Sequence, residues 1–478
     1  MRHPVWESNI PWHNQTTAAE GLDVRTGSFA GSLSRQRMTT TPTAKKDLLP
    51  ERRYRSLFCA VVGWPRHPGL SGGEIRDFHL LRRLLSLSRL EFFAVHGRPA
   101  DGRADPLARL VDAVHDPGTV PPEDRAETVR HWPWRVLMRA LRLRRWPVLG
   151  TRYAWDTAEQ LPSLRILRRS LQQTLERTDP DFLFVSPQTN PVALLLDTRR
   201  LRTRLIMASY DVEAVRIRRF VRSETGLRRL AMSLEARRAA RFERKNLKAF
   251  DGVIAVSDLD KSIFVGEHGF ASERVLVLEN GVDPAYFAFH ARPETGGAEI
   301  VFVGTMSYLA NEQAAWRLVR RIMPLLRRTH PEARLTLVGQ SPSPALLAQS
   351  DGKSTVVTGT VDDVRPYLAR GTAVCVPLIA GAGTKYKVLE ALSAGAPVVC
   401  SPLAVEGLEL ADERHLLVAE SDEGLAAALR RLIDDPQLAR RLAAEGRRLI
   451  ETRYAWDANL PRLDAWLDQM AALPKRHP

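Results

Sequence analysis

Short apolar runs alternate with segments of helical periodicity along this 478-residue chain, and they do so in two successive blocks. Apolar runs separated by helices are typical of strands buried on both faces, and such strands form parallel sheets with right-handed crossovers. The chain is also too long for one ordinary domain. The sequence therefore predicts an α/β fold with two doubly wound domains.

The first block carries six candidate strands, at 57–63, 92–97, 181–185, 204–209, 252–257 and 275–278. Helical periodicity lies between them at 76–87, 164–175 and 226–250. The second block repeats the alternation with strands at 300–303, 335–338, 355–357, 373–376, 397–400 and 416–418. Each block is thus expected to form its own sheet.

The boundaries follow from changes in composition and periodicity. Residues 1–53 are rich in Ser, Thr, Gly, Asn and Gln and have no sustained period, so a disordered tail is expected. An N-terminal domain is expected over 54–285, a linker over 286–298 and a C-terminal domain over 299–450. The last segment, 451–478, is a candidate helix that crosses back to the N-terminal domain.

The net charge of +15 calls for an explanation beyond solubility. Arginine is abundant along the whole chain, so we attribute part of the excess to a general compositional bias. The rest favours an anionic partner, such as a nucleotide diphosphate, a lipid phosphate or a membrane surface. A basic module interleaved with aromatic residues is missing, so we expect no specific nucleic-acid partner.

Localisation is predicted from three negative signals. No apolar stretch approaches the roughly 20 residues of a spanning helix, and the N-terminus lacks a secretory pattern. Cys59, Cys375 and Cys400 lie far apart in apolar runs, which favours buried free thiols over a disulfide or a metal site. A cytoplasmic protein is expected, with peripheral contact to the inner face of the plasma membrane as an option.

The segment 373–401 is the most informative part of the sequence. It contains a strand, a glycine loop, a helix and a second strand. Open α/β sheets bind ligands beyond the carboxyl ends of their strands, and a helix that begins there offers free amides to a phosphate. Gly381 and Gly383 allow close approach of the backbone, and Thr384 is a candidate N-cap.

Charged residues in the same segment point to an anion. Lys385 and Lys387 place positive charge at the start of a helix, where it is unfavourable for the helix itself. Glu390, one turn further on, is suited to accept hydrogen bonds from a ribose diol. An ordinary Lys387–Glu390 surface pair is the alternative. The spacing of a Walker loop is missing.

Two further motifs have simpler alternatives. Gly72 and Gly73 precede a helix after the first strand, where bare amides would face a ligand or merely form a turn. Asp258 and Asp260 make a DxD pattern, but they open a helix after a strand, so capping and first-turn charge explain them better than a metal. We predict no metal site.

The stretch 131–146 mixes Trp, Leu and Arg at helical spacing. A basic, aromatic helix of this kind is suited to lie on a membrane that carries a lipid-linked acceptor. A helix packed on the N-terminal domain with a basic outer face is the alternative.

These motifs together resemble a known enzyme family. The chain is similar to retaining glycosyltransferases of the family-four type, with the two-Rossmann fold called GT-B, and especially to bacterial sugar transferases of exopolysaccharide or surface-polysaccharide assembly. The matching strings cover nearly all of 57–470 in the right order. They are SGGEIRDFHLL, FDGVIAVSDLDKSIF, VLENGVDPAYF, IVFVGTMSYLAN, LTLVGQSP, VTGTVDDVRPYLA and PLIAGAGTKYKVLEALSAGAPVVCSPLAVEGL.

The resemblance implies a set of donor-binding residues. Glu390 matches the second Glu of the family's E-x7-E pattern, which binds the donor ribose. The diphosphate would be bound by Lys385, Lys387 and the amides of Gly383 and Thr384, with Gly304, Thr305, Gly72 and Gly73 beside it. Gly339 and the region 359–361, beginning at Gly359, would border the base.

Three positions depart from the family pattern. The first Glu of E-x7-E is replaced by Ala382, and the basic pair after the first strand of the second block is replaced by Thr305 and Asn311. Tyr210 stands where relatives often have an active-site His. The catalytic candidates are Gly73, Tyr210 and Asp211, and the acceptor-side candidates are Asp211 and Glu213.

The activity implied is transfer of a sugar from a nucleotide-diphosphate sugar of the UDP or GDP type to a glycan or lipid-linked acceptor. Retention of configuration is expected, with no metal and no cofactor other than the donor. Two alternatives stay open: a sugar-nucleotide 2-epimerase of the same fold, and a catalytically degenerate protein that binds glycan or nucleic acid.

Overall fold

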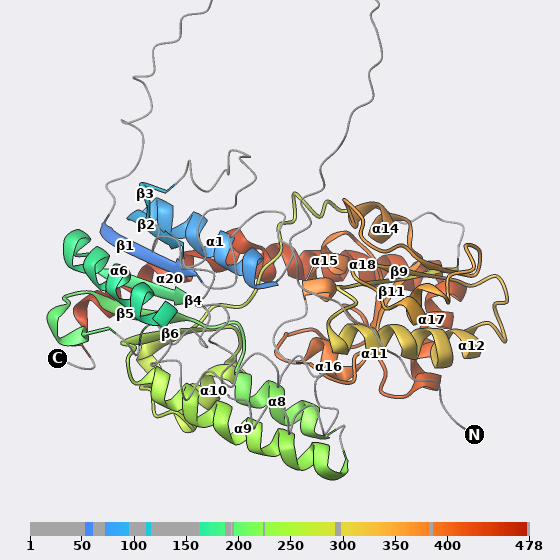
Figure 1. Ribbon diagram of the computed structural model, residues 1–478. Helices are drawn as coiled ribbons and strands as arrows, with labels where there is room; N and C mark the ends of the chain where they lie inside the picture. The colour runs from blue at the N-terminus through green and yellow to red at the C-terminus, as the bar shows by residue number, and fades with distance from the viewer. Residues whose placement is uncertain are drawn as a thin grey trace, which may run out of the picture. The chain divides into compact units, whose positions relative to one another are not determined.

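The computed structural model describes most of the chain from Arg53 to Lys475. The described residues are 53–60, 72–94, 111–115, 162–186, 193, 196–222, 225–291, 298–381 and 386–475. Two parallel sheets with alternating helices confirm the predicted fold class (Figure 1). Residues 1–52, which make up nearly all of the expected tail, lie outside the described residues.

The first sheet has seven strands in the order β3-β2-β1-β4-β5-β6-β7, all paired in parallel. The strands are β1 (Tyr54–Ala60), β2 (Ser88–Ala94), β3 (Ala113–His115), β4 (Phe182–Ser186), β5 (Arg204–Ala208), β6 (Gly252–Ala255) and β7 (Val275–Val277). Its helices are α1 (Gly72–Leu87), α6 (Pro162–Thr178), η3 (Thr198–Arg200), α8 (Glu213–Arg222), α9 (Gly226–Leu247), α10 (Asp258–Gly266) and η4 (Ser272–Arg274). β4 and β6 are buried along their whole length, which is why they are continuous apolar runs in the sequence.

The second sheet has six strands in the order β10-β9-β8-β11-β12-β13, again all parallel. They are β8 (Glu299–Val303), β9 (Arg334–Val338), β10 (Thr355–Val357), β11 (Ala373–Val376), β12 (Val398–Cys400) and β13 (Leu417–Val418). The helices after β8 are α11 (Leu309–Arg317), η5 (Leu318–Ile322), α12 (Met323–Leu326), α13 (Pro344–Leu347), α14 (Arg365–Arg370), α15 (Tyr386–Ser393), α16 (Pro402–Val405), α17 (Asp422–Asp434) and α18 (Pro436–Leu449).

Each sheet has one point at which the strand order reverses. In the first sheet the chain moves outward from β1 to β3 and then starts again on the other side of β1 with β4. In the second sheet the same reversal lies between β8 and β11. Ligands of doubly wound sheets bind beyond the carboxyl ends of the strands at this reversal. The fold therefore marks two edges to inspect.

The C-terminal helices extend from the second sheet back to the first. After α18 the chain continues through η6 (Ile450–Tyr454), α19 (Trp456–Asn459) and α20 (Pro461–Ala472). Trp466, Leu467 and Met470 of α20 belong to the same buried cluster as Phe58 of β1. A Cβ at Gly252 would lie 2.9 Å from Met470 and Trp466, so β6 and α20 are in close contact.

Two other sequence predictions can be compared with the structure. The three cysteines are free and buried, as predicted. β3 was not among the candidate strands, because three partly buried residues give too short an alternation to recognise. Among the described residues, no helix is long and apolar enough to cross a membrane.

Candidate functional site

Glycines line the carboxyl edge of the second sheet. Gly304 follows β8, Gly339 follows β9 and Gly359 lies just beyond β10. Gly339 has φ of +145°, and a Cβ there would lie 2.0 Å from the carbonyl oxygen of Gly304. Its amide donates to the carbonyl of Gly359 at 3.2 Å. Three backbone segments thus pack against one another at this edge, and bare backbone is what a ligand approaching it would meet.

Lys387 of α15 lies over this glycine edge. Its ammonium group donates a hydrogen bond to the Asn311 amide oxygen and lies 4.5 Å from the centre of the Phe302 ring. Asn311 in turn donates to the Thr305 carbonyl at 2.9 Å. A Cβ at Gly304 would come within 2.8 Å of the Asn311 amide nitrogen and 2.9 Å of the Lys387 nitrogen, so both side chains lie close against this glycine. Thr305 and Asn311 are the two departures from the family's basic pair. Asn311 contacts Lys387 directly, and Thr305 contacts Asn311.

Glu390 follows Lys387 by one turn of α15. Burial raises the pKa of its carboxyl group to about 7, and the positive charge of Lys387 opposes this shift. No hydrogen bond from another described residue reaches that carboxyl group. A partly buried acceptor without a donor is suited to a ligand's hydroxyl groups.

The loop before α15 is described only up to Gly381. Ala382, Gly383, Thr384 and Lys385 lie outside the described residues, so their predicted roles have no geometry here. The carbonyl of Gly381 accepts a hydrogen bond from Arg219 of α8 at 3.1 Å.

The two glycines at the start of α1 each lie against a tyrosine ring. A Cβ at Gly72 would come within 2.8 Å of Tyr386, the first residue of α15, and a Cβ at Gly73 within 2.6 Å of Tyr210. The glycine pair after the first strand and the helix that carries Lys387 and Glu390 are therefore neighbours in space. Sequence reasoning placed these glycines next to the diphosphate loop, and the contact with Tyr386 fits that placement.

A buried hydrogen-bonded cluster lies at the reversal point of the first sheet. Asp77 of α1 accepts from the Tyr210 hydroxyl at 2.6 Å and from the Ser186 hydroxyl at 2.8 Å. Ser186 ends β4 and Tyr210 follows β5, so three elements converge on one carboxyl group. Burial raises the pKa of Asp77 to about 7, although both hydrogen bonds oppose the shift.

Arg76 is the second buried charge of this cluster. Its Nη1 donates to the Leu278 carbonyl at 3.0 Å and to the Asn280 side chain at 2.8 Å. Its Nε and Nη2 are buried without a hydrogen-bond partner among the described residues. Burial lowers the pKa of the guanidinium, and the nearby Tyr386 and Asp77 oppose this.

The acceptor-side candidates lie at the start of α8. Glu213 is buried and its carboxylate receives two hydrogen bonds at 2.6 Å and one at 3.0 Å from Arg216, which also forms a 3.7 Å ion pair with Asp211. The burial of Glu213 therefore rules out a surface role for this residue. Arg216 holds both carboxylates beside Tyr210.

The DxD pattern has the structural role that was predicted for it. Ser257 is the N-cap of α10 and accepts from the Asp260 amide, while its hydroxyl donates to the Asp260 carboxylate. Asp258 and Asp260 provide the acidic first turn. Within the described ranges, no group of three or more His, Cys, Asp or Glu side chains is placed to hold a metal ion. The basic, aromatic stretch 131–146 lies outside the described residues.

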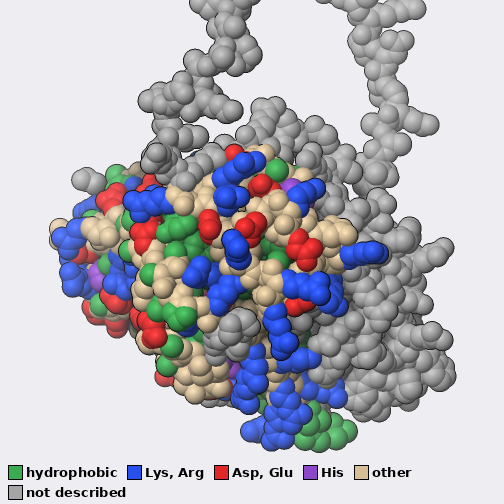
Figure 2. Space-filling model, turned by 90° about the vertical axis from the view of Figure 1, so that its left-hand side faces the viewer, with side chains coloured by type: hydrophobic (Ala, Val, Ile, Leu, Met, Phe, Trp, Pro, Cys, Tyr) green, Lys and Arg blue, Asp and Glu red, His purple; other side chains and the backbone are tan. Residues whose placement is uncertain are grey.

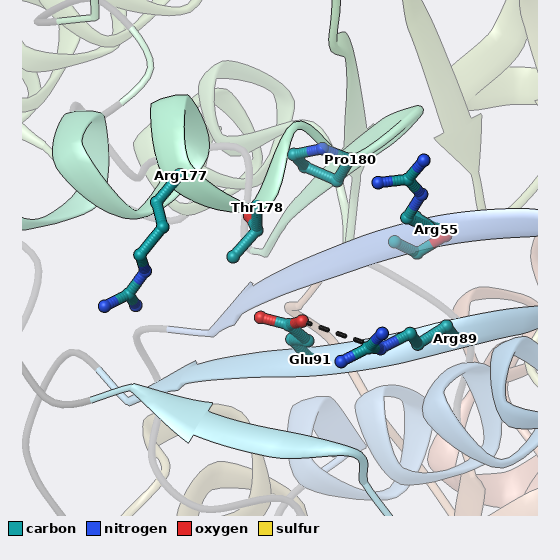
Figure 3. A pocket seen from close by; sticks show the side chains of 7 residues that line it. Arg55, Arg89, Glu91, Arg177, Thr178 and Pro180 are labelled. Carbon is teal, nitrogen blue, oxygen red and sulfur yellow. Dashed lines mark ion pairs between the residues drawn. The ribbon is translucent and has the colours of Figure 1, made fainter.

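A surface cavity of about 230 Å³ opens at the opposite edge of the first sheet. It is lined by Arg55, Ser56, Arg89, Glu91, Arg177, Thr178 and Pro180 (Figure 3). Arg89 forms a 4.0 Å ion pair with Glu91, and Arg177 contacts His115, which is itself paired with Glu91. Arg55 and Arg89 lie near the amino ends of β1 and β2, and Thr178 ends α6, so the cavity is away from the edge at which doubly wound sheets bind ligands.

Sequence reasoning missed Arg76, Asp77, Ser186 and Tyr386. The first two lie in a segment whose periodicity predicts only a helix, and nothing in the pattern separates them from its other charged residues. Ser186 gives no signal by itself. Tyr386 stands inside the quoted motif but was not singled out, because its contact with Gly72 depends on how the two sheets' elements meet.

Comparisons with known proteins agree with this geometry. Residues 104–281 match the family model described as glycosyl transferase 4-like domain, and residues 297–435 match the one described as glycosyl transferases group 1. Glycogen synthase of Mycobacterium tuberculosis is 32% identical over 197 residues, covering 38% of this chain and 45% of that protein. Phosphatidyl-myo-inositol mannosyltransferase of Mycolicibacterium smegmatis is 27% identical over 215 residues, covering 43% of this chain and 54% of that protein. The chain spans about half the length of these curated relatives.

Solved structures show the same fold at low sequence identity. Sucrose-phosphate synthase from Thermosynechococcus elongatus has a TM-score of 0.62 at 14% identity, over 87% of this chain and 99% of that chain. Anabaena HepE in complex with UDP and glucose has a TM-score of 0.58 at 13% identity, over the same shares of the two chains. The two family models together match most of the chain, and the solved structures show the GT-B fold, so the chain belongs to the glycosyltransferases of the family-four type.

Proposed function

We propose that this protein transfers a sugar from a nucleotide-diphosphate sugar to a glycan or lipid-linked acceptor. The observation that carries the proposal is the arrangement around α15. Lys387 lies over the glycine edge of the second sheet, Glu390 offers a carboxyl group that no described residue donates to, and Gly72 of the first sheet's helix α1 lies against Tyr386. A cation, an open acceptor and bare backbone in one place suit a pyrophosphate joined to a ribose.

The chemistry follows from charge development at the phosphate. Breaking the bond between the anomeric carbon and the diphosphate leaves negative charge on the departing phosphate and oxocarbenium character on the sugar. Lys387 and the amides at the start of α15 would stabilise the departing phosphate more than the intact donor, which lowers the barrier. We propose that this needs no metal and that configuration is retained. Glu390 would bind the ribose hydroxyls.

Nucleotide binding tests the proposal directly. Isothermal titration with UDP and GDP, and with their glucose and mannose conjugates, should find at least one ligand with micromolar affinity. Glu390→Ala and Lys385→Ala should each weaken that binding at least tenfold, because a hydrogen bond to a charged group contributes about 1.5–3 kcal/mol. Binding that is equal in both variants and the parent protein would refute the site. Leu347→Ser, a surface change on α13, is the matched control.

Neighbouring proteins give a starting point for the choice of nucleotide. Anabaena HepE was crystallised with UDP, with UDP and glucose, and with UDP-glucose. We therefore propose UDP-glucose as the first donor to assay, with release of UDP in the presence of a polyprenyl-linked sugar acceptor as the readout.

A further inference from the structure

The outer face of α9 is unusual for a protein surface. Leu227, Leu230 and Leu234 expose 73%, 59% and 48% of their area to solvent. They are spaced by three and four residues, so they lie on one side of the helix in its first turns. Three large apolar side chains grouped in this way mark an interaction surface rather than scattered exposure.

The same side of α9 is cationic over the rest of its length. Arg237, Arg241 and Arg244 continue the three- and four-residue spacing of the leucines and are exposed. The helix has two acidic residues, Glu235 and Glu243, and both are buried. Glu243 accepts hydrogen bonds from the amides of Glu213 and Ala214 and so caps α8. The outward face of α9 thus combines leucines at its start with arginines beyond them and has no described carboxylate.

Figure 2 shows where this face lies on the surface. Lys and Arg side chains gather over the lowest part of the described surface with hydrophobic side chains beside them, at the height where Figure 1 draws α8 and α9. The two helices pack together through a small core that includes Ile217 and Phe220 of α8 and Met232 of α9. The inner side of α9 is therefore occupied and its outer side is not covered by any described residue.

We propose that the outer face of α9 docks on an anionic lipid surface. Leucine side chains would enter the boundary between headgroups and acyl chains, and the arginines would bind lipid phosphates, since their long stems allow the charged ends to stay at the headgroups. Charge decides between this partner and a second copy of the chain. Two copies that met through this face would bring like-charged arginine rows together, in a protein whose net charge is +15.

Docking in this orientation has a consequence that rests on the proposed function. Ala380 belongs to the core of the α8–α9 pair, and Arg219 of α8 binds the Gly381 carbonyl at 3.1 Å. Ala380 and Gly381, which begin the glycine loop, are thus held against the same helix pair whose outer face would lie on the membrane. An acceptor carried by a lipid would then be presented beside the donor loop.

The test is co-sedimentation of the full-length protein with vesicles. Vesicles of phosphatidylcholine alone are compared with vesicles of phosphatidylcholine and phosphatidylglycerol at roughly 7:3, a bilayer with enough anionic lipid to attract basic segments. The protein should bind the anionic vesicles and bind the neutral ones much more weakly. The triple variant L227S/L230S/L234S should bind anionic vesicles at least tenfold more weakly. The affinity of R237S/R241S for anionic vesicles should fall about fivefold for each arginine, since a basic residue near such a surface contributes about that factor to binding.

Matched control variants show whether vesicle binding depends on this face of α9 or on exposed leucines and arginines in general. L259S/L347S changes two leucines that are 43% and 44% exposed on α10 and α13, and R328S/R430S changes two exposed arginines, one in the turn after α12 and one on α17. Both should bind vesicles within about twofold of the parent protein. UDP titration of the same samples shows whether the donor site is intact, so a failed lipid proposal and a failed transferase proposal give different results. The lipid proposal is overturned if the parent protein does not bind anionic vesicles, or if the triple leucine variant binds them as well as the parent does. It is also overturned if the leucine variant differs from the parent only in its oligomeric state or in its binding to an acidic protein.

Discussion

The two sheets differ in the residues that lie at the points where their strand order reverses. At the second sheet, Gly304 and Gly339 bring bare backbone together, and Lys387 and Glu390 add one cation and one open acceptor. At the first sheet, Asp77 is closed in by the hydroxyls of Tyr210 and Ser186. The edge of the second sheet leaves bare backbone and a carboxyl group for a ligand, whereas at the first sheet the Asp77 carboxyl group is hydrogen-bonded within the protein.

This difference indicates a division of roles. Backbone amides and lysine side chains suit a diphosphate, whose charge and shape are the same in every nucleotide sugar. A side-chain network is rigid and specific, and it positions groups rather than binding a phosphate. We therefore expect changes to the side chains of Lys387 and Glu390 to alter donor binding, and changes in the Asp77 cluster to alter stability and turnover.

The largest expected effect is at Gly339. Alanine there would place its Cβ 2.0 Å from a backbone oxygen, in a conformation with φ of +145° that side chains rarely adopt. We expect Gly339→Ala to lower the free energy of unfolding by about 3–5 kcal/mol through steric overlap and backbone strain. Urea denaturation followed by circular dichroism measures it.

Gly352 provides the control for that substitution. It has φ of +70° and nothing within 4 Å of an added Cβ. Gly352→Ala should cost only about 1 kcal/mol, the price of the left-handed backbone alone. Equal losses in the two variants would mean that close packing of the strand ends is unimportant.

The pH dependence of stability separates the Asp77 cluster from the rest. The pKa of Asp77 is about 7 in the folded protein, against an ordinary value of 3.8. An acid with a raised folded pKa stabilises the fold fully below its unfolded pKa, and this stability is lost as the pH rises through about 7. Between pH 5 and pH 8 the parent protein should therefore lose about 2–3 kcal/mol more than Asp77→Asn. Denaturation midpoints at four pH values give the comparison, and parallel curves for the two proteins would show that Asp77 is ionised throughout.

Tyr210→Phe should have a smaller effect in the same cluster. Removing the hydroxyl deletes one hydrogen bond to Asp77, at a cost of about 1 kcal/mol in unfolding free energy. Because that hydrogen bond lowers the pKa of Asp77, the pH at which stability falls should move upward. UDP affinity should stay within about twofold of the parent value, whereas turnover falls. Loss of UDP binding would show that the two edges are not separate in function.

Much of the fold was predictable because both sheets are buried on both faces. Strands such as β6 and β11 are apolar at every position, so their runs are visible without an alignment. The pair Lys387–Glu390 was singled out because both residues lie on one helix that follows a glycine loop, whereas Gly304, Gly339 and Gly359 are far apart in the sequence and were named only from the family resemblance. The alternation of apolar and helical segments does not predict β3, because this strand is short and only partly buried.

The Asp77 cluster was beyond sequence reasoning for a physical reason. Asp77 and Tyr210 are 133 positions apart and meet only because α1 and the end of β5 reach the same edge of the sheet. Arg76 and Asp77 are charged, and charge on a helix ordinarily indicates a solvent-facing side. Arg76 and Asp77 are instead buried, and this follows only from the packing of α1 against the ends of β4 and β5.

Titration of UDP into three proteins tests the central claim most directly: the parent chain, Glu390→Gln and Tyr210→Phe. The account predicts that Glu390→Gln loses about 10- to 100-fold in affinity, since a charge-assisted hydrogen bond to the ribose is weakened. Tyr210→Phe should bind UDP as the parent does. Equal affinity in Glu390→Gln and the parent protein would contradict the assignment of the donor site to the edge of the second sheet.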